Sequence, residues 1–532
     1  MDEILDWLRL ADKFADDGDA QGMLGAAREI LALDKNSADG YAVLAEANLY
    51  LGNLAAAENL APDNLRGRLV KAGVAAENFQ LIDALKNFSA VIETAREIGD
   101  KKILHKALTW SANSFYLAGD AKTAAENLRD ASALTANAER AAELFSKHLF
   151  LSNYNQPAGK SVAQDFNKFF ANVAPLAENF SHDKIRVGYI SPDFRQHAVA
   201  NFVKPLINDF DAENFSVVVY QTGASDFVTE ILKSKKVLWR DLSRFDADSA
   251  AKIIHADEID ILVDLSGHSQ NSCLPILARK PAPIQICAIG YVATTGLSAV
   301  DYFLSDEICG VDEENFTEKI LRAEGCHLCY APILKMPAAV HAENNSVTFG
   351  SFNNFAKVTD AVINLWREIL ASVPNSRLVI KNKICSIPDG REIVLNRLKN
   401  LPVELRPYSR DYLAQYNEID IALDTFPYNG GATTCEALFM NVPVISLRGN
   451  SHGSNFGASI LNAADLNELV AQDFGDYIKK AVDLARQKNL LADYHKNLRG
   501  KILASRLMDG RKYLRGLEKI YRQIRKPKRN AE

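Results

Sequence analysis

DTFPYNGGATTCEALFMNVPVISL, residues 424–447, is the stretch that decides the fold of this chain. A strand-like apolar run, residues 419–423, precedes it, and the pair Gly430-Gly431 leads into a helix-like run at 434–440 and a second buried strand. This layout can hold a phosphate, because glycine lets the backbone approach the anion and the first helical N–H groups point at it. The spacing is neither GxGxxG nor a Walker motif, so an ordinary βα turn in a parallel sheet fits equally well.

Upstream, β-branched strand-like runs alternate with helix-like runs. Predicted strands are 184–191, 215–220 and 259–265, and predicted helices are 199–209 and 248–256. Strands that alternate with helices predict a parallel sheet with ligands at the carboxyl ends of its strands. His197 and His268 each follow a predicted strand end. That place suits binding or catalysis, although a loop histidine is more often structural.

The alternation resumes downstream, with predicted strands at 347–352 and 377–381 and a predicted helix around 366–370. Lys357 follows the first of these strands, where a lysine could neutralise a diphosphate leaving group. A single lysine at such a place is otherwise a solvated surface residue. Two α/β lobes in tandem, each with its site at strand ends, suggest a ligand held in the cleft between them.

Composition and charge narrow the function classes. The 532 residues are 48% apolar and 24% charged, which is ordinary for a soluble globular protein of about three domains. The net charge of −6 does not favour general nucleic-acid binding. The acidic N-terminus lacks the basic and apolar segments of a signal peptide, and no apolar run reaches the ~18 residues of a membrane span. We expect a cytoplasmic protein whose locally basic end, residues 522–529, is a solvated tail.

Seven scattered cysteines indicate a reducing compartment rather than a disulfide framework. Cys326 and Cys329 have CxxC spacing around His327, but no second Cys or His pair follows at the distance of a zinc site. We therefore expect buried structural thiols there, with a metal or redox site as the less favoured alternative.

Residues 1–155 have the pattern of a helical repeat arm. Turn signals of glycine followed by Asp or Asn stand at Gly18, Gly52 and Gly119, separated by 34 and then 67 residues, close to twice 34. Ala-rich helices flank each turn, and a 34-residue period resembles tetratricopeptide repeats, although the repeat expected near residue 86 is poor. Such arms bind peptides or partner proteins on a concave face. The alternative is a helical bundle that only buttresses the rest of the chain.

Seven motifs together resemble the catalytic region of the O-GlcNAc transferase/SPINDLY family. They are GYISPDFRQHAVANF (188–202), DILVDLSGHS (260–269), RKPAPIQ (279–285), GYVATTGLSAVDYFLSD (290–306), FGSFNNFAKVTD (349–360), VPNSRLVIK (373–381) and the opening stretch. The resemblance runs from about residue 184 to about residue 521, and a tetratricopeptide-like arm in front matches the family's domain order.

The resemblance implies a GT-B fold of two Rossmann-like lobes, at 184–345 and 346–525, behind the arm at 1–155. It implies an inverting, metal-independent transfer of one sugar from a nucleotide-sugar co-substrate to a protein side chain, with no other cofactor. We expect GlcNAc from UDP-GlcNAc on Ser or Thr, and an acceptor protein bound through the arm. In a bacterial source, flagellin or an adhesin is a candidate acceptor.

The family's site residues carry over position by position. Lys357 matches the lysine that contacts the diphosphate, Glu436 an acidic position at the ribose hydroxyls, and His197 a histidine near the sugar and the acceptor hydroxyl. His197 could act as the general base for the acceptor hydroxyl or only orient that hydroxyl, and both roles stay open. The remaining expected nucleotide-sugar-binding residues are Asn354, Gly430, Gly431, Thr433, Thr434, His268 and Tyr412.

Several positions depart from the family pattern. Animal GlcNAc transferases read Gly-His-Thr-Thr where this chain reads Gly-Gly-Ala-Thr, so a histidine donor is missing, and Tyr412 and Gln415 replace a histidine and an arginine. The pair Gly267-His268 is closer to plant SPINDLY, which resembles a GDP-fucose user. Transfer of fucose from GDP-fucose, glycosylation of asparagine, and a non-catalytic interaction scaffold therefore remain alternatives.

Overall fold

The computed structural model describes residues 2–176, 178, 180, 182–233, 237–341 and 346–525. The basic residues Lys526, Lys528 and Arg529 of the expected tail lie outside these ranges. Among the described residues, no helix combines the length and the apolar character needed to cross a bilayer. The chain divides into two compact units, one made of Met1–His148 with Ser386–Arg397 and the other of the remaining residues.

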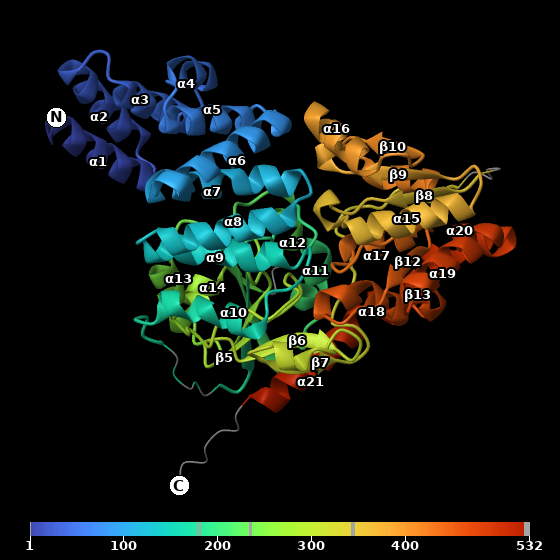
Figure 1. The fold of residues 1–532 in the computed structure, drawn as a ribbon. Helices are drawn as coiled ribbons and strands as arrows, with labels where there is room; N and C mark the ends of the chain where they lie inside the picture. Colours follow the sequence, from blue (N-terminus) through green and yellow to red (C-terminus); the bar gives the residue numbers. More distant parts are fainter. Residues whose placement is uncertain are drawn as a thin grey trace, which may run out of the picture. The chain divides into compact units, whose positions relative to one another are not determined.

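The first unit is helical, as predicted, and its helices run as antiparallel neighbours (Figure 1). They are α1 (Asp2–Asp16), α2 (Ala20–Leu33), α3 (Ala38–Tyr50), α4 (Leu54–Leu60), α5 (Leu65–Glu77), α6 (Leu81–Ile98), α7 (Lys101–Leu117), α8 (Ala121–Leu134) and most of α9 (Ala138–Ser152). The unit also holds α16 (Pro388–Arg397), where the Asp389 carboxylate accepts the Ile82 N–H at 3.1 Å.

The turns of this unit explain the irregular repeat. Gly18, Gly52 and Gly119 adopt the positive φ angles that favour glycine, between +71° and +85°. The turn missing near residue 86 lies at Phe79, which has a φ of 56° and no glycine to mark it. This turn comes early because the earlier helix α4 has only 7 residues. The longer α6, with 18 residues, compensates, so the distance from Gly52 to Gly119 is still close to two repeats. The predicted 34-residue period therefore holds for the first interval only.

The second unit contains two parallel sheets, which confirms the prediction of two α/β lobes. The first sheet has the strand order β3-β2-β1-β4-β5-β6-β7. Its strands are β1 (Ile185–Ser191), β2 (Phe215–Gln221), β3 (Leu238–Asp241), β4 (Ile261–Asp264), β5 (Ile284–Cys287), β6 (Tyr302–Asp306) and β7 (Lys319–Ala323). Around it lie α10 (Lys160–Gln164), α11 (Ala200–Asn208), α12 (Phe227–Leu232), α13 (Ala247–Ala256) and α14 (Leu274–Leu277).

The second sheet has the order β10-β9-β8-β11-β12-β13. Its strands are β8 (Thr348–Ser351), β9 (Arg377–Lys381), β10 (Val403–Arg406), β11 (Ile421–Leu423), β12 (Val444–Leu447) and β13 (Val470–Ala471). Its helices are α15 (Asp360–Ser372), α17 (Ala432–Phe439), α18 (Phe456–Ala463), α19 (Phe474–Arg486) and α20 (Lys488–Leu503). Short 3₁₀ helices of the unit include η3 (Phe355–Lys357), η5 (Tyr412–Glu418) and η6 (His452–Asn455).

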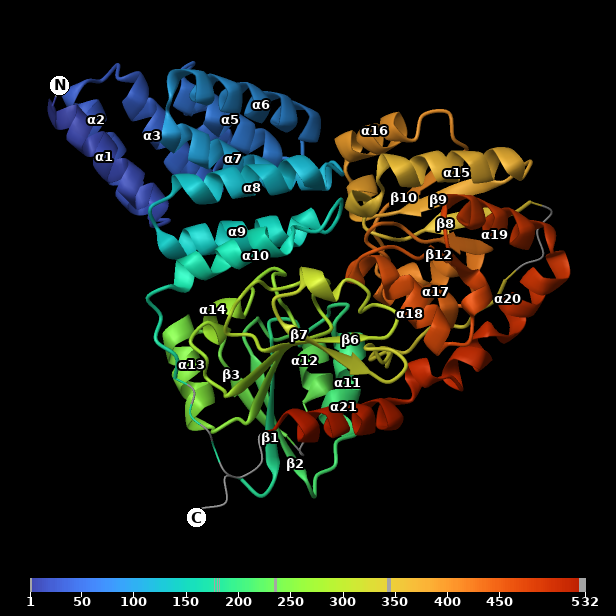
Figure 2. The same cartoon turned by 60° about the horizontal axis from the view of Figure 1, so that its bottom comes forward.

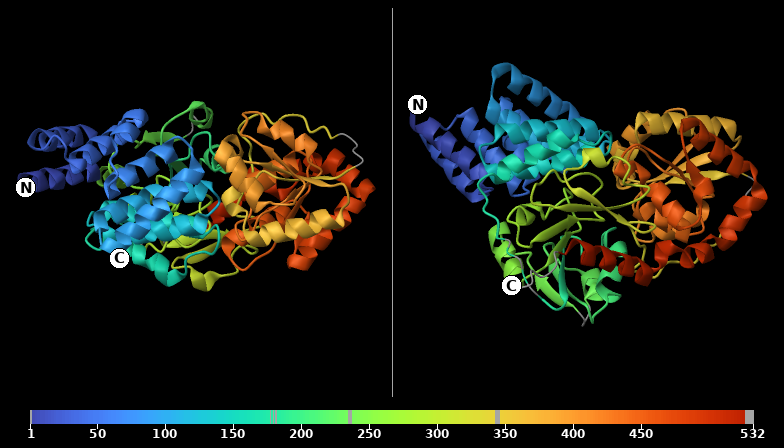
Figure 3. Two further views of the ribbon diagram at one scale, coloured as in Figure 1. Left: turned by 45° about the horizontal axis from the view of Figure 1, so that its top comes forward. Right: turned by 90° about the horizontal axis from the view of Figure 1, so that it is seen from below.

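The last helix, α21 (Gly510–Ile524), returns to the first lobe and lies beside α11 (Figures 2 and 3). The Glu518 carboxylate accepts the Asp211 N–H at 2.7 Å, and the hydroxyls of Tyr521 and Tyr189 are 3.4 Å apart. Burial of Tyr513, Leu514, Leu517 and Tyr521 against this lobe accounts for the crossing. The boundary predicted at 346–525 therefore assigns to the second lobe a helix that packs on the first.

Candidate functional site

A cleft of about 530 Å³ opens in the second unit and receives residues from both lobes. From the first lobe come the loop after β1, which includes Gln196 and His197, and a segment around Tyr330. From the second lobe come residues that follow β8 and β9 and the start of α17. The cleft thus lies at the carboxyl ends of parallel strands, where open α/β sheets bind their ligands.

One buried carboxylate, Asp424 at the end of β11, organises the glycine turn. Its oxygens accept the N–H groups of Thr425 at 2.9 Å and Gly430 at 2.7 Å, and the Ser446 hydroxyl at 2.7 Å. Burial raises the pKa of Asp424, while these hydrogen bonds and the nearby Lys357 ammonium act in the opposite direction. The polypeptide between Thr425 and Gly430 is therefore folded back around a single acceptor.

The turn runs directly into α17, whose N-cap is Gly431. The Thr434 hydroxyl donates to the Gly430 carbonyl at 2.9 Å, and the Thr433 hydroxyl donates to Asn353 Oδ1 at 2.9 Å. Ala432 and Thr433 line the cleft. The first N–H groups of a helix lack intrahelical acceptors and carry its positive dipole end, so this edge of the cleft suits an anion.

Lys357 ends η3 and lies beside the glycine turn. Its Nζ donates to the carbonyl of Asn429 at 2.8 Å and stands 3.7 Å from the centre of the Tyr428 ring. Burial lowers the pKa of Lys357 to about 8, although the charge of Asp424 acts to raise it. Lys357 itself is not among the residues that line the 530 Å³ cleft, but it is only partly buried. An anion at the turn would bring a charge partner to this ammonium.

A second polar pair lies on the cleft wall. Glu436, on α17, accepts a hydrogen bond from the Tyr412 hydroxyl at 2.6 Å, and both residues line the cleft. Burial raises the pKa of Glu436 to about 7. The pair therefore places hydrogen-bond acceptors where a sugar hydroxyl can reach them.

His197 also reaches the cleft, from the opposite lobe. Its Nδ1 lies 3.5 Å from Asp193 Oδ2, and Arg195 lies at the same distance from the other oxygen of that carboxylate. Burial is the largest influence on His197 and lowers its pKa. The imidazole is therefore neutral near pH 7 and able to accept a proton from a hydroxyl in the cleft.

Besides Lys357, five expected residues do not line the cleft: Gly430, Gly431, Thr434, His268 and Asn354. His268 is buried, with Nε2 2.8 Å from the Thr295 carbonyl and its ring packed on Phe166 and Tyr291, and it does not line the cleft. The side-chain oxygen Oδ1 of Asn354 accepts the Ala356 N–H at 3.1 Å, whereas Oδ1 of its neighbour Asn353 accepts a hydrogen bond from the Thr433 hydroxyl. Their roles in holding a nucleotide sugar stay predictions.

Basic and aromatic cleft residues were absent from the sequence-based expectations. They are Phe352, Lys381, Lys383, Tyr408 and Arg410. The Lys381 ammonium donates to the Pro407 carbonyl at 2.5 Å and to the Ser409 hydroxyl at 3.0 Å. Phe352 and Lys381 end the predicted strands 347–352 and 377–381, and Lys383 follows the second of them, whereas Tyr408 and Arg410 follow β10, which the sequence patterns do not predict. Gln415, noted as a departure from the family, donates to Ser409 and does not line the cleft.

Gly430 and Gly431 form a matched pair for a test of the turn. A Cβ at Gly430 would lie 2.4 Å from Thr433 Oγ1 and 2.7 Å from Thr434 Oγ1, whereas a Cβ at Gly431 would meet only Phe456, at 3.7 Å. We expect Gly430→Ala to cost about 1–3 kcal/mol of stability, the usual cost of overpacking. Gly431→Ala should change the thermal midpoint little. Equal midpoints for the two variants in scanning calorimetry would contradict the packing described here.

Residues 170–323 and 322–517 match the model of glycosyl transferase family 41. A rice (Oryza sativa subsp. japonica) protein named "Probable UDP-N-acetylglucosamine--peptide N-acetylglucosaminyltransferase SPINDLY" is 36% identical over 388 residues. The Arabidopsis thaliana protein of the same name is 38% identical over 362 residues. These matches cover 68% and 64% of this chain but only 41% and 39% of the two relatives.

Among solved structures, a lysine-to-methionine mutant of the Thermobaculum terrenum O-GlcNAc transferase aligns with a TM-score of 0.72 and 26% identity. The alignment covers 98% of this chain and 97% of that one. A helical arm followed by two parallel-sheet lobes is the GT-B arrangement that the family resemblance implied, so the predicted fold class is confirmed. The chain belongs to glycosyl transferase family 41.

Proposed function

We propose that this chain is an inverting protein glycosyltransferase that moves GlcNAc from UDP-GlcNAc to Ser or Thr of an acceptor protein, without a catalytic divalent ion. The observation that carries the proposal is the Lys357 ammonium beside the Gly430 turn and the N-terminus of α17. Family membership supports the reaction class. The names of the similar SPINDLY proteins and of the Thermobaculum terrenum O-GlcNAc transferase support GlcNAc as the sugar.

The leaving group is a nucleoside diphosphate. The bond between the anomeric carbon and the β-phosphate oxygen breaks, and the electron pair stays on the phosphate. Lys357 and the first N–H groups of α17 would stabilise that charge with groups already in place. Burial prepares the lysine for this, because an ammonium poorly solvated by water gains more from a phosphate.

The acceptor hydroxyl forms the new bond on the opposite face of the anomeric carbon. Its proton would pass to His197, because burial lowers the pKa of this histidine and so favours the neutral imidazole, the form with a ring nitrogen free to accept a proton. Glu436 would accept hydrogen bonds from the ribose hydroxyls, held in place by Tyr412. The aromatic faces of Phe352 and Tyr408 offer apolar walls for the base and sugar.

GDP-fucose is the second candidate donor. At Ala432 this chain presents a methyl group to the cleft close to where animal relatives have a histidine donor. Purified chain, an acceptor library and a panel of UDP- and GDP-sugars, read by mass spectrometry, would decide. An added mass of one N-acetylhexosamine with UDP-GlcNAc supports the first donor. Transfer from GDP-fucose alone would replace it, and no transfer or hydrolysis from any donor would favour a scaffold.

Lys357→Met should lower kcat about 10²–10³-fold, the usual cost of one lost electrostatic donor at a developing charge. The thermal midpoint should not fall, because burial disfavours the ammonium in the folded chain. Lys252→Met, on the exposed face of α13, is the matched control. Transfer by Lys357→Met at the rate of the control would refute the assigned role.

The pH dependence of kcat/KM for the donor should also reveal the pKa of Lys357. A diphosphate prefers the ammonium form, and the free chain loses that proton as pH rises through about 8. Therefore kcat/KM for the donor should fall about tenfold per pH unit above pH 8. Lys357→Arg stays charged, so its activity, whatever its level, should lack this fall. An identical alkaline limb in both proteins would assign it to another group.

A further inference from the structure

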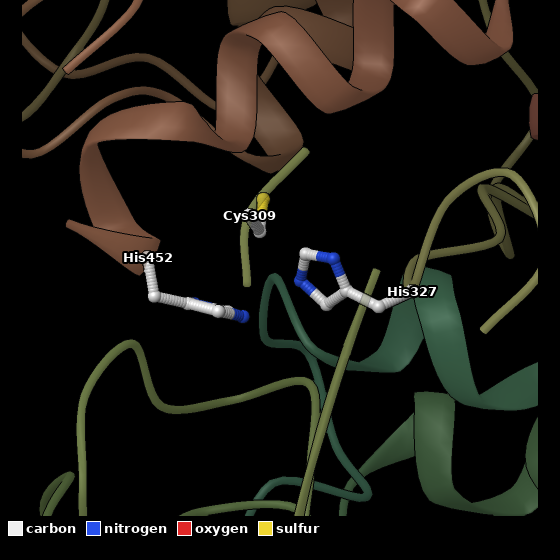
Figure 4. Close-up of side chains that lie close together, drawn as sticks. All are labelled: Cys309, His327 and His452. Carbon is white, nitrogen blue, oxygen red and sulfur yellow. The ribbon is translucent and has the colours of Figure 1, made fainter. Parts of the chain in front are cut away.

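A compact group of metal-binding side chain types lies away from the cleft, inside the second unit. Cys309 follows β6, His327 follows β7, and His452 begins η6 in the other lobe. One potential ligand atom from each lies within 4.8 Å of the other two, and the imidazoles of His327 and His452 point toward one another near the Cys309 sulfur (Figure 4). All three side chains are buried, and none lines the cleft.

The hydrogen bonds of this group are incomplete. His327 Nδ1 lies 2.6 Å from Asp306 Oδ2, which leaves Nε2 to face the interior of the group. Within the described residues, His327 Nε2 and both ring nitrogens of His452 have no hydrogen-bond partner. A buried polar group left unpaired costs about 1–3 kcal/mol. An unpaired nitrogen from each of two facing imidazoles, buried at one point, indicates a ligand that binds one nitrogen of each ring.

The aromatic side chains packed around His452 offer its ring nitrogens no hydrogen-bond partner. Its ring stacks edge-on against Phe303, at a centroid distance of 5.0 Å, and against Phe456, at 5.3 Å. Those neighbours provide apolar surface and no acceptor. A phenylalanine would fill this aromatic box without unpaired nitrogens, so packing alone does not explain a histidine.

Charge points to a cation. The Asp306 carboxylate is fully buried and accepts hydrogen bonds from the N–H groups of Ile308, Cys309 and His327 and from the Ser459 hydroxyl, an arrangement that suits its ionised form. A divalent ion bound to a Cys309 thiolate and two neutral imidazoles would leave one positive charge. The neighbouring Asp306 would cancel it, so the filled site would be neutral.

We propose that Cys309, His327 and His452 bind a zinc-type divalent ion. Mixed thiolate and imidazole ligands suit Zn²⁺, whose tetrahedral bonds of about 2.0–2.3 Å place ligand atoms some 3.3–3.8 Å apart. The three atoms, within 4.8 Å now, need shifts of about 1 Å or less to reach that spacing. Asp306 would orient His327 from behind, in the carboxylate–histidine–metal arrangement common at zinc sites.

The site would join the two lobes. Cys309 and His327 belong to the first lobe and His452 to the second, so one ion would tie β6 and β7 to η6. Binding to the folded chain alone raises its stability by mass action. The proposal is independent of the reaction in the cleft, because no ligand is a cleft residue.

Metal content is the primary test, on untagged full-length chain. After ZnCl₂ addition and gel filtration, we expect about one zinc per chain by plasma mass spectrometry. Cys309→Ser and His452→Phe should lose it, and Cys273→Ser, at a buried thiol paired with Thr222, should keep it. Less than a tenth of an equivalent in the wild-type chain, or full zinc in His452→Phe, would overturn the proposal.

Cobalt gives a readout that does not depend on the variants' folding. Addition of CoCl₂ to chelator-treated wild-type chain should produce the charge-transfer absorption of a cobalt–thiolate bond, and ZnCl₂ should abolish it. Absence of that band would refute the Cys309 ligand. Calorimetry of UDP with zinc-free chain separates this result from the proposed function, because nucleotide affinity should persist without the ion.

Discussion

The interaction on which the cleft depends is the contact of the buried Asp424 carboxylate with the glycine turn. By accepting the Thr425 and Gly430 N–H groups, this side chain folds the backbone between β11 and α17 into a cradle. Its negative charge also acts on Lys357. Burial lowers the pKa of that lysine, and the charge of Asp424 partly offsets this fall, which favours the ammonium form. The turn is therefore arranged before any anion arrives, which is the condition for strong electrostatic stabilisation.

Both lobes contribute side chains to the cleft. The second lobe supplies the cationic groups and Glu436, on a sheet edge where backbone dipoles already favour an anion. The first lobe supplies His197, held near Asp193, at the opposite wall. The proposed ion at Cys309 lies in the same unit but outside the cleft, so it would serve the packing of the lobes and not the chemistry.

Sequence patterns predicted the features that depend on neighbouring residues, such as strands and the glycine turn. Apolar β-branched runs located β1, β2, β4, β8, β9, β11 and β12 to within a few residues, and the glycine pair located the turn before α17, whereas β3, β6, β7, β10 and β13 were not predicted. Phe79, a turn without glycine, and the return of α21 to the first lobe carry no local signal, since distant packing decides them. The thiol of Cys309 lies far in sequence from His452, so CxxC spacing at 326–329 could not reveal their meeting.

The most direct measurement is a crystal structure of the chain with a bound nucleoside diphosphate, UDP or GDP. We expect the β-phosphate within hydrogen-bond distance of Lys357 Nζ and of the N–H groups of Ala432 or Thr433, with ribose hydroxyls near Glu436. A diphosphate bound elsewhere in the cleft, with Lys357 still donating to Asn429 and no phosphate beside it, would contradict the account.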